Sequence, residues 1–285
     1  CLWGLSEVLL ARFPFFWIGL GASFVPTDPL LAGLARWIGG GGLAALQLLL
    51  GWWVWRICSS WRRGVSWHRS FFLGLLFLVL AHGLGWSLLP TVDASSFRSV
   101  AVWQPAVQIR TKFSEREKLR LLVLTQKALA SAKELGAAWL VAPEGTLQID
   151  QKISDPLPIP FFYGGFRWAL GQQRNALLFV DKGKTSVSAF IDKHRLVPLG
   201  EWMPSWSVPL TRGLSAVGGV QPGKPSRLLE WLGPNAGVAI CYELSNGNAL
   251  AQAVNEGAEW LLAVANLDPY PLSLQRQFVA LSQIR

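Results

Sequence analysis

Three side chains far apart in the sequence have the types needed for acyl transfer through a thiol. Glu144, Lys193 and Cys241 each stand at the end of a short apolar run of the kind that forms a buried strand. A thiol attacks as its thiolate, so it needs a base, and Glu144 can take its proton and later return it to the leaving group. Lys193 can supply positive charge to the thiolate and to the oxyanion of the intermediate. The spacing therefore predicts one site where loops converge at strand ends.

Each of these residues also has a structural alternative. A lone thiol at a strand end is often a small buried hydrophobe, while Glu144 alone could be a solvated loop carboxylate and Lys193 alone a surface lysine. We expect a dry site to raise the pKa of Glu144 toward neutrality. His194 adjoins Lys193 and is expected to point away, so no Cys-His pair is predicted. No metal site is predicted, because one Cys and one His do not make a zinc centre.

An α/β domain must position these residues. Ser114 and Glu117 form a capping box that opens a helix, and Gly136 closes it. Gly136–Ala142 resembles Gly257–Ala263. The similarity indicates either a chance match between connections that are common in α/β proteins or a pseudo-symmetric fold of two α/β layers. Residues 202–226 are expected to form a long loop. The expected helices are 115–135 and 249–255, and the expected strands are 99–107, one ending at Glu144, 161–168, 176–180, 186–191, one ending at Cys241, and 260–265.

The first third of the chain has a different composition. Of 26 Lys and Arg and 17 Asp and Glu in 285 residues, only six Arg, Glu7 and Asp28 lie in residues 1–91. Residues 37–55 and 71–89 carry no charge, and each is long enough to cross a bilayer core of about 30 Å. Residues 1–25 are expected to be the end of a further span and an interfacial aromatic stretch. His82, in mid-span, is expected to be a hydrogen-bonded interhelical histidine.

These features predict two domains, transmembrane helices in residues 1–91 and an extracytoplasmic catalytic domain in residues 92–285. Both ends look cut, so we expect a fragment of a longer protein. The linker 56–69 carries four Arg and no acid, which places it in the cytoplasm by the positive-inside rule. Everything after residue 90 would then lie outside, in the periplasm of a diderm bacterium.

The compartment and the charge bear on Cys241 and on possible partners. Cys241 is the only cysteine after Cys58, and a free thiol is uncommon in an oxidising compartment, which favours a functional role. The net charge of +9 predicts mild attraction to anionic lipid. No basic stretch with interleaved aromatics is present, so a nucleic-acid partner is not expected.

Around the three candidate residues, the chain resembles the nitrilase, or carbon–nitrogen hydrolase, superfamily. Within it, the motifs at 143–144, 192–201 and 240–243 look like bacterial apolipoprotein N-acyltransferase, as do Trp3–Glu7 and Phe13–Trp17. Two stretches differ: Phe113 replaces a family Trp, and Ala265–Tyr270 reduces a Ser-Asn-Asp-x-Trp-Phe pattern. The resemblance implies an αββα sandwich preceded by transmembrane helices, with the catalytic set Glu144, Lys193 and Cys241 and no cofactor.

The resemblance also implies a reaction. Cys241 would take a fatty acyl chain from a phospholipid as a thioester and pass it to the α-amino group of the diacylglyceryl-cysteine of an apolipoprotein. It implies supporting roles for Glu201, Tyr242 and Glu243, although Glu201 could be a plain loop carboxylate beside Trp202. Alternatives are a membrane-anchored amidase that passes the acyl group to water, and an inactive scaffold. Trp202, Trp206 and Leu210 are expected either to form a lipid-facing lid or to pack in the core.

Overall fold

The computed structural model describes residues 2–13, 19–89, 98–107, 114–147, 153, 155–198, 200–202, 219–268 and 270–284. Parts of four predictions lie outside these ranges: Phe113, residues 14–17 of the aromatic stretch, residues 203–218 of the expected long loop, and Trp206 and Leu210 of the expected lid. The chain forms two compact units, one of residues 1–93 with 272–285 and the other of residues 94–271.

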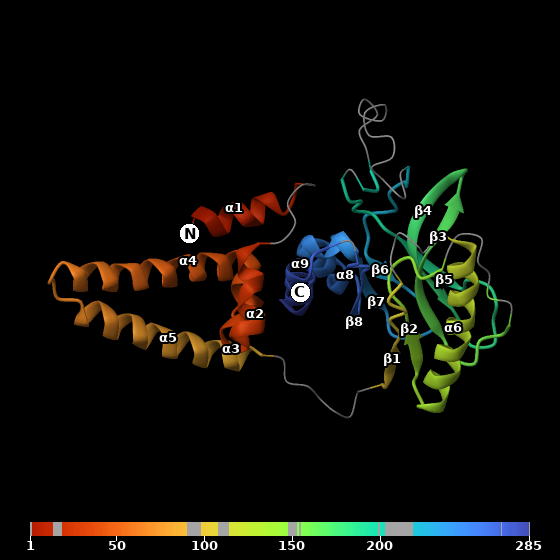
Figure 1. Ribbon diagram of the computed structural model, residues 1–285, viewed down its shortest axis with the longest axis horizontal. Coiled ribbons are helices and arrows are strands. Elements are labelled where there is room, and N and C mark those ends of the chain that lie inside the picture. Colours follow the sequence, from red (N-terminus) through yellow and green to blue (C-terminus); the bar gives the residue numbers. More distant parts are fainter. Residues whose placement is uncertain are drawn as a thin grey trace. The chain divides into compact units, whose positions relative to one another are not determined.

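The first unit is helical (Figure 1). Two of its helices, α4 and α5, are long and apolar enough to cross a membrane, and most of their side chains are exposed. This composition is typical of a membrane-associated protein. Its elements are α1 (Leu2–Leu10), η1 (Leu20–Ser23), α2 (Phe24–Thr27), α3 (Pro29–Ala32), α4 (Ala35–Arg62), α5 (His68–Leu88) and α9 (Leu272–Ile284).

Small residues and a few polar contacts hold the helical unit together. A side chain at Gly4 of α1 would collide with the backbone of Gly41 in α4, which is the close approach that membrane helices make through glycine. His82 Nε2 lies 2.8 Å from Asp28 Oδ2, so α5 is hydrogen-bonded to the start of α3 as expected for an interhelical histidine. The C-terminal helix α9 contacts α2, η1 and α4, so it packs with this unit.

Within the described residues of the second unit, two β-sheets and two covering helices are present. The five-stranded sheet has the order β1-β2-β3-β4-β5, and the three-stranded sheet the order β6-β7-β8. The strands are β1 (Val100–Val102), β2 (Trp139–Val141), β3 (Phe161–Ala169), β4 (Gln172–Val180), β5 (Ala189–Asp192), β6 (Leu228–Leu229), β7 (Ala236–Ile240) and β8 (Trp260–Val264). The helices are α6 (Glu115–Glu134) and α8 (Gly247–Asn255), and η4 (Cys241–Ser245) is a short 3-10 turn.

The layers follow from which side chains pack together. Leu129 and Ala132 of α6 share a core with one face of the five-stranded sheet. The other face of that sheet packs on the three-stranded sheet, with Phe162 and Val238 in one buried cluster. On the outer face of β7, the space beside Gly237 is bounded by Ala253 of α8. The order is therefore helix, sheet, sheet, helix, which confirms the predicted αββα sandwich.

The predicted helix start and end are confirmed in α6. Ser114 caps the Glu117 N–H, and Gly136 has a φ of 69° that suits glycine. Gly257 ends α8 with a φ of 108°, and each helix is followed by a strand that pairs in parallel with a neighbour, β2 with β1 and β8 with β7. The similar stretches at 136 and 257 thus form the same helix–glycine–strand connection.

Three strand predictions need correction, and the simplest concerns the expected strand 186–191, which is β5 and begins at Ala189. The first strand ends at Val102 instead of 107, because Pro105 has no N–H to donate and Ala106 adopts a φ of 50°. β4 begins at Gln172 instead of 176, since it forms a long antiparallel hairpin with β3 that extends past the rest of the sheet (Figure 1). The apolar pattern predicted only residues 176–180 of β4.

Candidate active site

The backbone at Cys241 is strained. β7 is buried along its whole length, and Cys241 follows it with a φ of 51° at the first position of η4. A non-glycine residue in the left-handed region costs about 1–2 kcal/mol. Such strain persists where the surroundings enforce it, often at functional sites. The side chain is buried, with 4% of its surface exposed.

Glu144 is held by the turn after β2, which is packed tightly on β3. A side chain at Gly164 would collide with the Glu144 Cα and the Pro143 carbonyl, so the strand needs glycine there. The Gly164 N–H donates to the Pro143 carbonyl at 3.1 Å, and Thr146 Oγ1 donates to the same oxygen at 2.7 Å. The loop that carries the carboxylate is therefore fixed by backbone contact.

Lys193 follows β5 and is almost fully buried, with 1% of its surface exposed. Its Nζ donates to Glu144 Oε1 at 2.8 Å and to Glu201 Oε1 at 2.9 Å. Its own N–H donates to the Asn175 carbonyl, and its carbonyl accepts from Gly223, both at 2.8 Å. The structure thus brings Glu144 and Lys193 together as predicted from their places at strand ends.

Glu201 lies in the same cluster. In addition to the contact with Lys193, Glu201 Oε2 accepts a hydrogen bond from the Val197 N–H at 2.9 Å. This bond attaches the carboxylate to the loop after Lys193. The alternative of a plain loop carboxylate therefore does not describe its position. Trp202 is 44% exposed beside it.

Asn175 is a member of the site that the sequence analysis missed. Its Nδ2 donates to Glu144 Oε1 and to Glu201 Oε1, both at 2.8 Å. It lies on β4, on the face where Leu177 and Phe179 point into the core between the sheets. A polar residue in step with these apolar ones would have been a usable signal, had the strand been predicted to start early enough.

Glu243 connects the Cys241 turn to the Lys193 loop. Its carboxylate accepts from the N–H groups of Ile240 at 2.9 Å and of His194 at 2.8 Å, and from Arg227 Nη1 at 2.8 Å. Both Glu243 and Arg227 are 3% exposed, so this is a buried ion pair. Arg227 was not predicted from the sequence.

Tyr242 and His194 are the sequence neighbours of Cys241 and Lys193. Tyr242 is 1% exposed, and the guanidinium of Arg195 lies 5.1 Å from the centre of its ring. The His194 ring contacts the Gly223 carbonyl at 2.8 Å through Nδ1, which agrees with the expectation that it points away from the site.

Burial and charge set the protonation of the cluster. Burial raises the pKa of Glu144, but the Lys193 ammonium and the hydrogen bonds from Lys193, Asn175 and Asn266 outweigh it and hold that pKa below its usual value. The prediction that the site raises the pKa of Glu144 was therefore wrong. Burial lowers the pKa of Lys193, yet the Glu144, Cys241 and Glu201 charges raise it well above its usual value.

The thiol shifts in the opposite direction from the carboxylate. Burial and the Glu144 charge raise the pKa of Cys241 well above its usual value, while Lys193 opposes this rise. At neutral pH the cluster therefore holds a protonated thiol, an ionised carboxylate and an ammonium group. This arrangement can move a proton from sulfur to Glu144 as the sulfur attacks an acyl carbon.

The stretch after β8 completes the surroundings of the cluster. The Asn266 N–H donates to Glu144 Oε2 at 3.3 Å. Burial, together with the Cys241 charge, raises the pKa of Tyr270, which shows that its phenol lies near the cluster. These residues belong to the stretch whose sequence departs from the family pattern.

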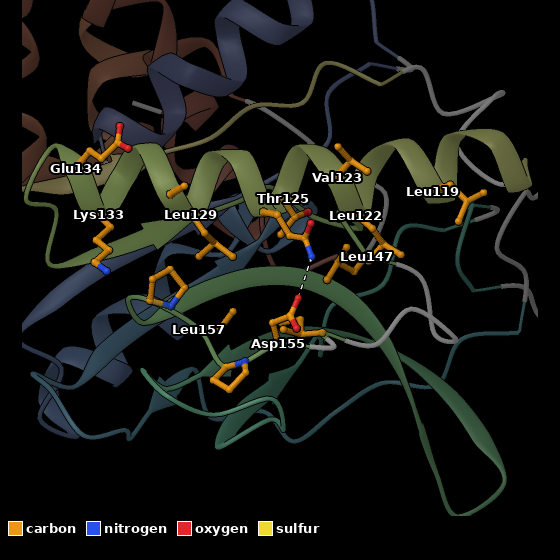
Figure 2. Close-up of a pocket in the computed structure, with 15 residues that line it drawn as sticks. Leu119, Leu122, Val123, Thr125, Leu129, Lys133, Glu134, Leu147, Asp155 and Leu157 are labelled. Carbon is orange, nitrogen blue, oxygen red and sulfur yellow. Dashed lines mark hydrogen bonds between the residues drawn. The ribbon is translucent and has the colours of Figure 1, made fainter.

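A separate cavity of about 880 Å³ lies under α6 (Figure 2). It is lined mainly by apolar side chains such as Leu122 and Leu129, and Gln126 Nε2 donates to Asp155 Oδ2 at 3.2 Å across it. None of Glu144, Lys193, Glu201 and Cys241 lines it. It is therefore not the place where those groups would meet a substrate.

Comparison with known proteins supports the resemblance seen in the motifs. The chain is 65% identical over 284 residues to a protein of Prochlorococcus marinus (strain MIT 9313) named Apolipoprotein N-acyltransferase. It is 55% identical to a protein of that name from a second strain of P. marinus, and 50% identical to one from Parasynechococcus marenigrum (strain WH8102). Each alignment covers all of this chain, and 57%, 58% and 60% of the respective relatives.

The chain thus spans less than two thirds of the length of the curated relatives it matches. No protein-family model matches it. Among solved structures, an amidase from Nesterenkonia sp. is 16% identical with a TM-score of 0.41, covering 62% of this chain and 67% of that one. A second structure of this amidase, described as from the nitrilase superfamily, is 16% identical with a TM-score of 0.42, covering 62% and 68%. The homology to the named relatives confirms the family resemblance predicted from the motifs.

Proposed function

We propose that this chain, a homologue over its whole length of apolipoprotein N-acyltransferases, is the catalytic part of such an enzyme. It would move a fatty acyl chain from a membrane phospholipid to the α-amino group of the N-terminal diacylglyceryl-cysteine of an apolipoprotein. The observation that carries the proposal is the strained Cys241, whose thiol is hydrogen-bonded to Glu144 of the Glu144–Lys193 ion pair. The sequence similarity to the named relatives supports the choice of substrates.

The first half-reaction would form an acyl-enzyme. Cys241 sulfur attacks the carbonyl carbon of the phospholipid ester while its proton passes to Glu144. The oxyanion that forms is stabilised by the Lys193 ammonium. The C–O bond then breaks, Glu144 returns its proton to the departing alkoxide, and a thioester and a lysophospholipid remain.

The second half-reaction would consume the thioester. The acceptor amine attacks the thioester carbon and gives a proton to Glu144, and the intermediate collapses to an amide as the C–S bond breaks. Glu144 then protonates the departing thiolate, which restores the starting state. Glu201 and Asn175 do not take part in bond making in this scheme, since they hold Lys193 and Glu144 in place.

The test is mass spectrometry of the full-length protein reconstituted with phospholipid. We expect a fatty-acyl adduct on Cys241, and none in the Cys241→Ala or Glu144→Gln variants. Adding a diacylglyceryl-cysteine peptide should convert the adduct to an N-acylated peptide. Release only as free fatty acid would indicate the amidase alternative, and a chain that never acylates would indicate an inactive scaffold.

We further propose a multi-pass protein of the bacterial plasma membrane with its sandwich outside the cytoplasm. The four arginines between residues 56 and 69 support this orientation. Cys58 is exposed near the end of α4, so labelling of its thiol tests the orientation. A membrane-impermeant maleimide should label Cys58 in inverted vesicles but not in intact cells, and labelling in intact cells would reverse the orientation.

A further inference from the structure

The β3–β4 hairpin projects beyond its sheet (Figure 1). β2 pairs with β3 only as far as Phe162, and β5 pairs with β4 only from Ala176 onward. From Phe162 to Ala169, β3 continues for about 23 Å at roughly 3.3 Å per residue. Its outer part, a ribbon of β3 and β4, pairs with no third strand among the described residues, although the Gln221 N–H donates to the Gln173 carbonyl at 2.9 Å.

The tip of this ribbon carries apolar side chains that the protein does not bury. Leu170 is 97% exposed and Trp168 is 61% exposed. Leu170 and Gly171 form a two-residue turn with φ values of 52° and 75°. Turns of this kind favour Asn or Gly at the first position, so neither turn geometry nor packing explains a leucine there.

Basic residues flank the tip on the same ribbon. Arg167 Nε and Nη2 contact Asp192 at 2.6 and 2.7 Å, and Arg174 Nη1 contacts it at 3.1 Å. Two guanidinium groups on one carboxylate leave an excess positive charge. The Arg167 guanidinium also lies 3.8 Å from the centre of the half-exposed Phe190 ring.

The ribbon leaves the sheet on the side where the catalytic loops lie. β2 and β3 are parallel, so Glu144 at the end of β2 and the tip after β3 lie at the same edge. β5 runs antiparallel to β4 and therefore in the direction of β3, which puts Lys193 at this edge too. A surface that receives an acyl chain through this edge would meet the ribbon tip.

We propose that the hairpin tip inserts into the bilayer interface, with Trp168 and Leu170 among the lipids and Arg167 and Arg174 beside anionic headgroups. This inference rests on the proposed function, which requires the catalytic edge to receive a phospholipid. Trp and Arg are the residues that favour this depth, and the excess positive charge is complementary to anionic lipid. The exposed apolar side chains of the tip would then be removed from water.

The test measures the depth of the tip in the membrane. The full-length protein, with Cys1 and Cys58 changed to Ser and Cys241 to Ala, receives an environment-sensitive fluorophore at Leu170→Cys. Vesicles of phosphatidylethanolamine and phosphatidylglycerol are the probe. The matched control is Lys182→Cys, an exposed position at the opposite end of β4.

We expect blue-shifted emission at position 170 that is quenched by nitroxide-labelled lipids, and emission at position 182 that is quenched by aqueous iodide. Equal iodide quenching at both positions would overturn the proposal. A blue shift at 170 that disappears as the protein is diluted in lipid would also overturn it, because the tip would then contact a second copy of the chain.

An activity measurement separates this inference from the proposed function. The Trp168→Ser/Leu170→Ser variant should acylate from vesicle phospholipid about tenfold more slowly, the loss expected for one or two buried apolar side chains. Its acylation by a water-soluble short-chain ester should be unchanged. Equal loss with both donors would contradict the proposal. If wild-type protein never acylates, the proposed function fails, while the fluorescence still decides the position of the tip.

Discussion

Opposite shifts of two neighbouring groups keep the proton on Cys241 until it is needed. The pKa of the thiol is raised and the pKa of Glu144 is lowered. A free thiolate would be open to oxidation in an oxidising compartment, whereas a protonated thiol beside a ready base is much less reactive. The residue-level design thus favours proton transfer together with attack.

Lys193→Met should reverse the sign of the Glu144 shift. In the wild type the Lys193 ammonium lowers the pKa of Glu144 more than burial raises it, so Glu144 stays ionised below the ordinary Glu pKa of about 4.3. The fall in the Cys241 acylation rate on acidification should therefore occur below that pH. Without the cation, burial raises the pKa of Glu144, so the acylation rate should fall at a higher pH than in the wild type. Its maximum should also drop about 10²–10³-fold. Lys182→Met is the surface control. A fall at the same pH as in the wild type, in a folded variant checked by circular dichroism, would contradict this account.

Glu243→Gln tests the buried pair with Arg227. Because the variant leaves the guanidinium buried without its counter-charge, we expect about 3–5 kcal/mol lower stability. The measurement is the free energy of unfolding of the αββα sandwich in urea. Glu115→Gln, which removes an exposed pair with Lys118, should change it by less than about 1 kcal/mol. Equal small effects would show that the Glu243 pair does not hold the Cys241 turn.

At the scale of the elements, two loops depend on close backbone contact. Gly164 allows the Glu144 turn to lie on β3, and Gly223 allows residue 223 to lie on the backbone of Asp192. Neither glycine has a positive φ, so the requirement is space and not conformation. Such contacts fix a carboxylate or an ammonium without a side chain of their own.

Gly164→Ala should therefore impair acylation more than folding. The added methyl would push the Glu144 backbone away from β3, and a displacement of about 1 Å in a reacting group can cost roughly 10²-fold in rate. Gly165→Ala is the control, since its nearest neighbour is the end of the Leu178 side chain at 3.1 Å, which can shift. The readout is the acylation rate of Cys241 beside the melting temperature. Equal rates in the two variants would refute the positioning role.

The sequence predicted the elements with strong local signals and missed those set by pairing. The Ser114 N-cap of α6 and the apolar runs before Glu144, Lys193 and Cys241 are local, and the structure has them in place. The early start of β4 depends on pairing with β3, in a stretch of polar and basic residues that has no apolar alternation. Asn175 was missed with it. The catalytic roles of the residues that cluster here stay a prediction.

At the scale of the whole molecule, the helical unit and the sandwich are interleaved in sequence. The predicted division at residue 91 follows composition, and it stays a prediction for the membrane boundary. Packing groups α9 with the N-terminal helices, although α9 follows the sandwich in the chain. Composition alone gave no sign of this, because α9 is amphipathic and shorter than a membrane span.

A protease site placed between α5 and β1 should therefore not release the sandwich. After cleavage, residues 98–271 remain covalently joined to α9, which contacts α2, η1 and α4. We expect the cleaved sandwich to sediment with the membranes. A second site between β8 and α9 should release it when both are cut. Release after the first cut alone would show that the α9 contacts are too weak to hold it.

The return of α9 also changes how the reacting thiol meets its substrates. A domain joined at one end sweeps a wide volume, whereas one joined at both ends behaves as an inserted loop with restricted rotation. The thiol would then keep a high local concentration relative to the lipid surface throughout both half-reactions. Under the proposed function, the acyl donor and the acceptor amine would then come to a sulfur whose own motion is restricted.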